Sequence, residues 1–67
     1  MTDGVNLINN IKKIRMENNK TQEELARMLD ISLRSYQNIE KNKQIPNVIT
    51  ALKLAKILNT TVENLYI

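Results

Sequence analysis

The chain contains no cysteine and no histidine among its 67 residues. It therefore cannot form disulfides, use a thiol nucleophile or an imidazole base, or bind zinc through these side chains. Its seven acidic residues include no evident inward-facing pair, and no glycine-rich phosphate loop is present. We therefore expect no enzymatic activity, no metal site, no cofactor and no small-molecule ligand.

The chain also lacks any apolar run near the ~18 residues that a membrane-spanning helix needs. Its first residues have neither the basic start nor the apolar stretch of a signal peptide. We therefore expect a cytoplasmic protein with no membrane partner. Ten Lys and Arg against seven Asp and Glu give a net charge of +3, which suits nucleic acid but is common in other small proteins.

Glycine and proline are almost absent, since the chain has only Gly4 and Pro46. Two-residue hairpin turns usually need glycine, and no strict alternation of apolar and polar residues is present, so β structure is disfavoured. Aromatic residues are limited to Tyr36 and Tyr66, so the core must be aliphatic. Helical spacing predicts five short helices in one domain, residues 1–67, with its core within residues 6–66.

The helix starts are marked by capping residues. Thr21 and Glu24 form a capping-box pattern, and Ser32 is a candidate N-cap for the third helix. The first helix is predicted over residues 6–18, the fourth after Pro46 and Asn47, and the last after Thr61. The apolar positions predicted to face the core are Leu7, Ile8, Ile11, Ile14, Leu25, Met28, Leu29, Ile31, Tyr36, Ile39, Val48, Ala51, Leu52, Ala55, Leu58, Val62 and Leu65.

Four predicted helix ends carry asparagine or aspartate where glycine is usual, namely Asn19, Asp30, Asn42 and Asn59. These residue types tolerate the left-handed backbone region best after glycine. We therefore expect all four to end their helices in that conformation.

Only Asp30 and Ile31 separate the second helix from the cap of the third. Two short amphipathic helices joined by so tight a turn predict a helix-turn-helix over residues 21–41, with the small Ala26 where the helices cross. Segments 20–26, 30–32, 39–43 and 54–58, together with Pro46, resemble the Cro/C1-type (lambda-repressor-like, XRE) domain. The resemblance covers residues 11–65, and departs from the family at Asp30 and Asn42, where glycine is usual.

The resemblance implies an all-α, compact five-helix lambda-repressor-like DNA-binding domain of bacterial or phage origin. Its recognition helix would be residues 33–41, whose outward face carries a guanidinium, two carboxamides, an ammonium and an aliphatic group. These groups suit base edges in the major groove. The predicted base contacts are Leu33, Arg34, Ser35, Gln37 and Asn38.

Other roles follow mainly from the resemblance. Gln22 would bind a backbone phosphate at a helix start, where free N–H groups favour an anion. The predicted phosphate contacts are Thr21, Gln22, Lys41, Asn42 and Lys43. The family commonly pairs the residues at the positions of Arg15 and Glu40, so we expect a buried salt bridge there. The predicted homodimer surface comprises Ile57, Val62, Tyr66 and Ile67.

These features predict a sequence-specific regulator of transcription, a repressor that binds double-stranded DNA as a homodimer. The alternative is an antitoxin or co-regulator that uses the same fold chiefly to hold a protein partner. A requirement for Leu33, Arg34 and Asn38 in DNA binding would separate the two hypotheses.

Overall fold

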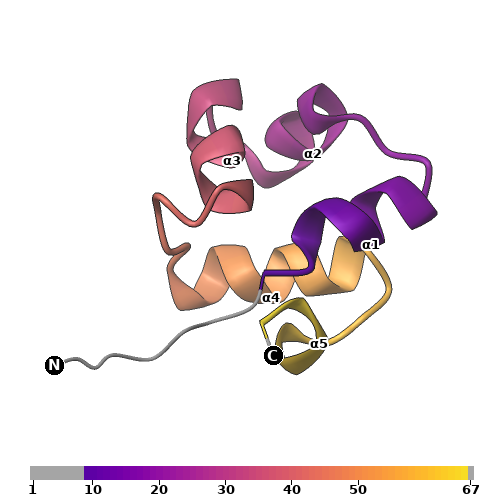
Figure 1. The fold of residues 1–67 in the computed structure, drawn as a ribbon. Coiled ribbons are helices and arrows are strands. Elements are labelled where there is room, and N and C mark those ends of the chain that lie inside the picture. The colour runs from indigo at the N-terminus through magenta and orange to yellow at the C-terminus, as the bar shows by residue number, and fades with distance from the viewer. Residues whose placement is uncertain (1–8, 67) are drawn as a thin grey trace, which may run out of the picture.

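The computed structural model describes residues 9–66, which form five helices (Figure 1). The helices are α1 (Ile11–Glu17), α2 (Gln22–Leu29), α3 (Leu33–Glu40), α4 (Val48–Ile57) and α5 (Val62–Leu65). The predicted all-α, five-helix architecture is therefore confirmed. In the described part of the chain, no helix has the length and apolar character needed to cross a membrane.

The predicted helix caps are present. The Thr21 hydroxyl accepts a hydrogen bond from the Glu24 backbone N–H at 3.0 Å, and the Glu24 carboxylate accepts one from the Thr21 N–H at 2.8 Å. This reciprocal bonding lowers the pKa of Glu24. The side chains of Ser32, Asn47 and Thr61 cap α3, α4 and α5, each by accepting a hydrogen bond from the backbone N–H three residues later. Each cap satisfies an N–H group that the helix itself leaves unpaired.

The four predicted left-handed residues all adopt that conformation. Their φ angles are 57° at Asn19, 57° at Asp30, 60° at Asn42 and 56° at Asn59. The chain therefore turns after α1, α2, α3 and α4 without glycine, because Asn and Asp pay the smallest steric penalty there among residues with a side chain.

The start of the first helix was predicted too early. Residues 6–8 lie outside the described part of the chain, while Asn9 and Asn10 are not helical and α1 begins at Ile11. Asn9 instead forms an antiparallel bridge with Tyr66, and the Asn10 N–H donates to the Leu65 carbonyl at 2.9 Å. These backbone bonds connect the residues before α1 to the end of α5. Asn9 and Asn10 could not make them if their backbone groups were bonded within a helix.

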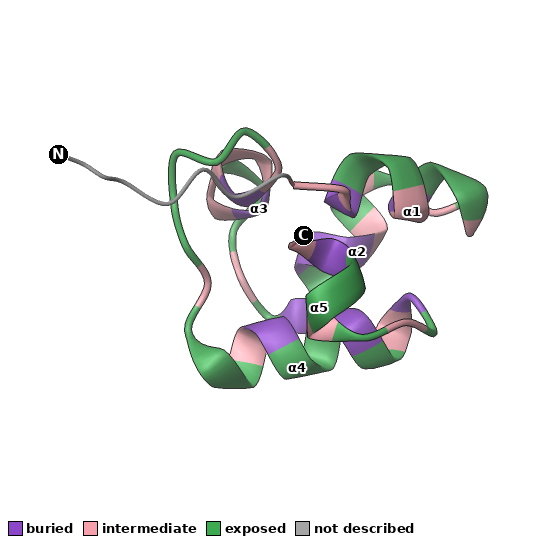
Figure 2. Ribbon diagram, turned by 60° about the horizontal axis from the view of Figure 1, so that its bottom comes forward, coloured by how far each residue is buried: buried purple, intermediate pink, exposed green. Residues whose placement is uncertain are grey.

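The core lies between all five helices (Figure 2). Its buried members are Ile11, Leu25, Ala26, Leu29, Tyr36, Ile39, Ala51, Leu54, Ala55, Leu58 and Leu65. The partly buried Ile14, Ile31, Ile57, Val62 and Tyr66 pack against this set. Most of the predicted core positions are thus confirmed, whereas Leu7 and Ile8 lie outside the described residues.

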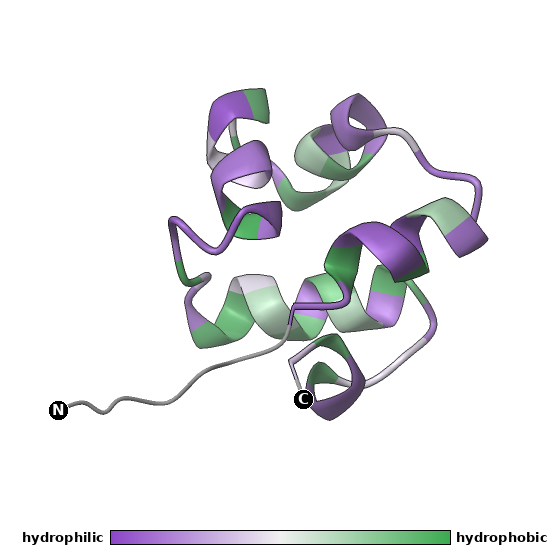
Figure 3. Ribbon diagram, viewed as in Figure 1, coloured by the Kyte–Doolittle hydropathy of each residue, from purple (hydrophilic) through white to green (hydrophobic). Residues whose placement is uncertain are grey.

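Three predicted core residues are instead exposed, namely Met28 (50%), Val48 (73%) and Leu52 (57%). The inward face of α4 consists of Ala51, Leu54 and Ala55. Leu52 lies about 100° around the helix from Ala51 and therefore faces solvent. The hydropathy pattern was ambiguous here because α4 is apolar around much of its circumference, in contrast to the largely hydrophilic outer part of α3 (Figure 3).

Candidate nucleic-acid interface

Helices α2 and α3 form a helix-turn-helix unit joined by a tight, hydrogen-bonded turn. Asp30, in the left-handed conformation, donates its N–H to the Arg27 carbonyl at 3.1 Å. The Ile31 N–H donates to the Ala26 carbonyl at 3.0 Å. These bonds satisfy two of the last four carbonyls of α2 and set the direction in which α3 leaves the turn.

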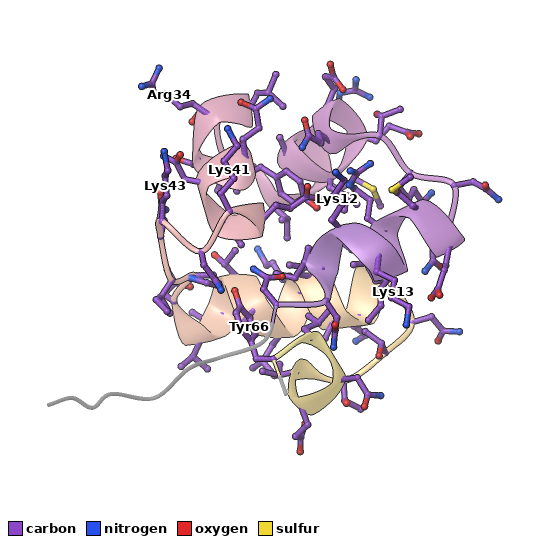
Figure 4. The ribbon with its side chains drawn as sticks, in the orientation of Figure 1. Lys12, Lys13, Arg34, Lys41, Lys43 and Tyr66 are labelled. Carbon is purple, nitrogen blue, oxygen red and sulfur yellow. The ribbon has the colours of Figure 1, made fainter. Side chains whose placement is uncertain are left out.

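The outer face of α3 presents the residues predicted to contact bases. Leu33 and Arg34 are exposed, and Ser35, Gln37 and Asn38 are half-buried along the same helix. Arg34 projects away from the ribbon at the start of α3 (Figure 4). Leu33 exposes 36% of its surface although the fully buried Tyr36 and Ile39 occupy the inner face of the helix. The accessible part of α3 therefore combines an aliphatic and a cationic group at its N-terminal end with two carboxamides further along the helix.

The segment after α3 adds two cations to this side of the molecule. Lys41 and Lys43 are exposed and lie at the C-terminal end of α3 and in the following loop (Figure 4). The Lys43 N–H donates to the Asn38 carbonyl at 2.9 Å, which holds the loop against the helix. The Asn42 carboxamide oxygen accepts a hydrogen bond from Asn9 at 3.1 Å. Part of the Asn42 side chain is therefore engaged within the protein.

The ion pair predicted between the first and third helices is present. Arg15 Nε donates to Glu40 Oε2 at 2.6 Å, and the two side chains are only 11% and 4% exposed. Arg15 Nη1 also donates to the Lys20 carbonyl at 2.9 Å, which fixes the segment that leads into α2. The hydrogen bond with Glu40 raises the pKa of Arg15. One buried guanidinium therefore connects α1, the start of the helix-turn-helix and the end of α3.

Glu40 accepts further hydrogen bonds from the Tyr36 hydroxyl and from Gln22 Nε2, the latter at 3.1 Å. Burial disfavours the carboxylate charge, but the hydrogen bonds from Arg15, Tyr36 and Gln22 outweigh it and lower the pKa of Glu40. Burial and the neighbouring carboxylate raise the pKa of Tyr36. At neutral pH, Glu40 is therefore a charged, acceptor-only group beneath the outer face of α3.

Two of the predicted DNA contacts touch each other. Gln22, at the first position of α2, accepts a hydrogen bond from Gln37 Nε2 at 3.1 Å while it donates to Glu40. Nothing in the sequence pattern indicated this contact, because 15 residues separate the pair and only the docked helices bring them together. Thr21, the other predicted contact at this helix start, is engaged in the capping box, although its hydroxyl hydrogen remains able to donate.

The predicted dimer residues are less exposed than expected. Ile57, Val62 and Tyr66 pack partly against the core, and Ile67 lies outside the described residues. Burial raises the pKa of the Tyr66 hydroxyl.

Four of the exposed apolar side chains lie elsewhere, on the segment before α4 and on α4 itself. We call this set the α4 patch; its members are Ile45 (67%), Val48 (73%), Ile49 (66%) and Leu52 (57%). Three of these residues, Ile45, Val48 and Leu52, line an open apolar hollow together with Pro46, Val62 and Tyr66. The sequence analysis assigned no role to Ile45 or Ile49, and so did not predict that they would form an exposed apolar surface.

Comparisons with known proteins agree with this geometry. A helix-turn-helix family model matches residues 11–65. An uncharacterised HTH-type transcriptional regulator of Methanocaldococcus jannaschii is 37% identical over 59 residues, covering 88% of this chain and 89% of that protein. A second such regulator, from Archaeoglobus fulgidus, is 35% identical over 57 residues, with coverages of 85% and 80%. These two relatives are archaeal, whereas a bacterial or phage source was expected.

A solved structure is also similar, that of the biofilm master regulator SinR in complex with DNA. The two chains superpose with a TM-score of 0.74 at 28% identity, over 84% of this chain and 90% of the chain in that structure. The tight turn after α2, the buried pair of Arg15 and Glu40, and the match over residues 11–65 all lead to one assignment. The chain belongs to the Cro/C1-type helix-turn-helix family.

Proposed function

We propose that this protein is a sequence-specific repressor of transcription, acting in the cytoplasm, that reads double-stranded DNA with α3. The outer face of α3 carries the proposal, because it exposes Leu33 and Arg34 next to Gln37 and Asn38. Such a set can bond guanine and adenine edges and contact a thymine methyl group. The similar proteins are described as HTH-type transcriptional regulators, and SinR is described in complex with DNA.

In this proposal, bases are contacted by Leu33, Arg34, Ser35, Gln37 and Asn38. The N-terminal part of α3 enters the major groove, as in other helix-turn-helix proteins. Backbone phosphates are contacted by Thr21, Gln22, Lys41, Asn42 and Lys43, which flank α3 at the start of α2 and in the loop after α3. These phosphate contacts fix the register of the protein on DNA, while the α3 side chains supply sequence preference.

We further propose that the protein binds as a homodimer. One small domain makes few contacts, and regulators of this type place two copies on half-sites about one helical turn apart. The dimer surface in this proposal comprises Ile57, Val62, Tyr66 and Ile67. The α4 patch supports it, because three of its members line the same apolar hollow as Val62 and Tyr66. Each of its four side chains, now more than half exposed, would contribute roughly 1 kcal/mol or more when covered.

Selection of bound DNA fragments by the purified protein tests the proposal. Wild-type protein should recover a site with two-fold symmetry, and Arg34→Ala should lose or relax the preference at one base pair of each half-site. Lys53→Ala, which removes an exposed cation from α4, is the matched control and should recover the wild-type site. Recovery of fragments without any common site would contradict sequence-specific binding. In a reporter assay, a selected site placed across a promoter should lower transcription.

The α4 patch also favours a second candidate, an antitoxin or co-regulator that binds a different protein. An exposed apolar patch rimmed by polar residues is typical of a protein–protein contact. Ile49→Glu separates the two readings. If the homodimer acts on DNA, the variant should be monomeric in analytical ultracentrifugation and should lose affinity for the symmetric site. If the variant keeps the wild-type oligomeric mass and DNA affinity, the result would favour the second candidate, in which the patch binds a different protein.

A further inference from the structure

A chain of hydrogen bonds runs from the buried ion pair to the outer face of α3. It begins at Glu40, whose Oε2 accepts from Arg15 at 2.6 Å and also from the Tyr36 hydroxyl. Its other oxygen, Oε1, accepts from Gln22 Nε2 at 3.1 Å. An ionised carboxylate can only accept hydrogen bonds. Glu40 therefore requires that Gln22 turn its NH₂ group, and not its oxygen, toward the protein interior.

The orientation of Gln22 in turn fixes that of Gln37. With its NH₂ group on Glu40, Gln22 turns its oxygen toward α3, where Gln37 Nε2 donates to it at 3.1 Å. Reversing the Gln37 carboxamide would set two acceptor oxygens against each other at this distance. Both residues are half-buried, so water replaces these bonds poorly. The Glu40 carboxylate thereby fixes, through Gln22, which end of the Gln37 carboxamide carries the oxygen and which the NH₂ group.

This direction decides what Gln37 can offer to DNA. One of its two N–H groups is used by Gln22, and its carbonyl oxygen and second N–H remain for a ligand. Gln37 lies one turn after Leu33, on the flank of α3 that faces the start of α2. In the major groove, adenine and cytosine present amino donors, whereas guanine and thymine present carbonyl acceptors at the corresponding edge.

We propose that the Gln37 carbonyl oxygen makes the base contact and so selects a base with a major-groove amino group, adenine or cytosine, and that Gln22 is the positioning residue that fixes this preference. The inference rests on the proposed function, since it requires sequence-specific binding through α3. It assigns Gln22 a role in specificity in addition to its proposed phosphate contact. A phosphate contact alone would change affinity for all sequences alike.

The test compares base preferences rather than affinities, because the folded fraction of a partly unfolded variant still shows which bases it prefers. Fragments selected by wild-type protein, Gln37→Ala, Gln22→Leu and Lys41→Ala are sequenced, and thermal unfolding of each protein is recorded. Gln37→Ala locates the base pair that Gln37 reads. Gln22→Leu removes the acceptor that orients Gln37 while leaving a side chain of similar size. Lys41→Ala is the control for loss of a proposed phosphate contact.

We expect wild-type protein to prefer adenine or cytosine at that base pair by roughly 10-fold, the scale of one good side-chain contact to a base. Gln37→Ala should abolish the preference. Gln22→Leu should reduce it to less than about 3-fold at that base pair alone, because a free carboxamide can rotate and also donate to guanine or thymine. Lys41→Ala should bind more weakly but keep every preference.

The inference is overturned if Gln22→Leu weakens binding but keeps the wild-type preference at every position. It is also overturned if Gln37→Ala changes no position. In both cases a selected wild-type site would still support the proposed function. Wild-type protein without preference at any base pair would overturn the proposed function and the inference together.

Discussion

Replacement of Arg15 by alanine should destabilise the domain far more than it alters base preference. Arg15 is buried and lies under α3 rather than on its outer face. Its removal would strand the carboxylate of Glu40, whose side chain is 4% exposed, without its counter-ion. It would also remove the hydrogen bond to the Lys20 carbonyl, which fixes the segment before α2.

The size of the effect follows from the partners that remain. Removing one member of a buried ion pair costs about 3–5 kcal/mol. Glu40 keeps its donors from Tyr36 and Gln22, so we expect the lower end, about 3 kcal/mol. A domain of this size has a total stability of only about 3–10 kcal/mol, so the loss is a large fraction of it. The corresponding fall in Tm is more than about 10 °C.

Thermal and urea unfolding, followed by far-UV circular dichroism, measure this loss. Lys12→Ala is the matched control, since it removes an exposed cation from the same helix and should change stability by less than about 0.5 kcal/mol. The double variant Arg15→Met/Glu40→Met should be less destabilised than the sum of its single variants, because no charge is left unpaired. Arg15→Ala with a wild-type Tm and lower DNA affinity would refute the structural role and place Arg15 at the DNA.

Three further predictions concern stability. Asp30→Gly should raise the free energy of unfolding by about 0.5–1 kcal/mol in urea titrations, because glycine adopts φ of 57° without steric cost. Asn42→Gly should gain less, since it loses the bond from Asn9, and a lower Tm in both variants would refute the reasoning. Thr21→Ala removes one half of the capping box and should cost about 1 kcal/mol, an effect that an unchanged Tm would contradict. Stability should fall as the pH drops below 4.5, the ordinary value for Glu40, because its pKa is lower in the folded protein and protonation then favours the unfolded chain. Urea titrations from pH 7 to pH 3 measure this fall, which should be shallower in Glu40→Gln.

Features that depend on a few neighbouring residues could be predicted from the sequence. The capping box at Thr21 and the left-handed turns at Asn19 and Asp30 need only local steric and hydrogen-bonding preferences. The helix-turn-helix followed from the short spacing between the second helix and the cap of the third.

Features that depend on helix docking could not be predicted in the same way. Met28 and Leu52 are apolar and lie at plausible helical positions, yet the packing directions of α2 and α4 leave both exposed. The contact between Gln22 and Gln37 arises only because α2 and α3 meet at a particular distance and angle. The pairing of Arg15 with Glu40 was expected from the family resemblance, whereas the hydrogen bonds that Glu40 accepts from Tyr36 and Gln22 were not.

The start of α1 at Ile11, later than the predicted start at residue 6, has a similar cause. Asn9 and Asn10 carry polar side chains that are compatible with a helix start, but the bridge to Tyr66 and the bond to Leu65 compete with helical bonding. A partner more than 50 residues away decides the local conformation.

The central claim, that the outer face of α3 reads DNA sequence, is tested most directly by one affinity ratio. The ratio compares binding of the selected site with binding of a scrambled site, measured at two salt concentrations for wild-type protein and Arg34→Ala. We expect wild-type protein to favour its site by at least about 1,000-fold, and Arg34→Ala to lower this ratio by roughly 10-fold or more. A wild-type ratio near one that is unaffected by Arg34→Ala, with affinity set only by salt, would contradict the claim.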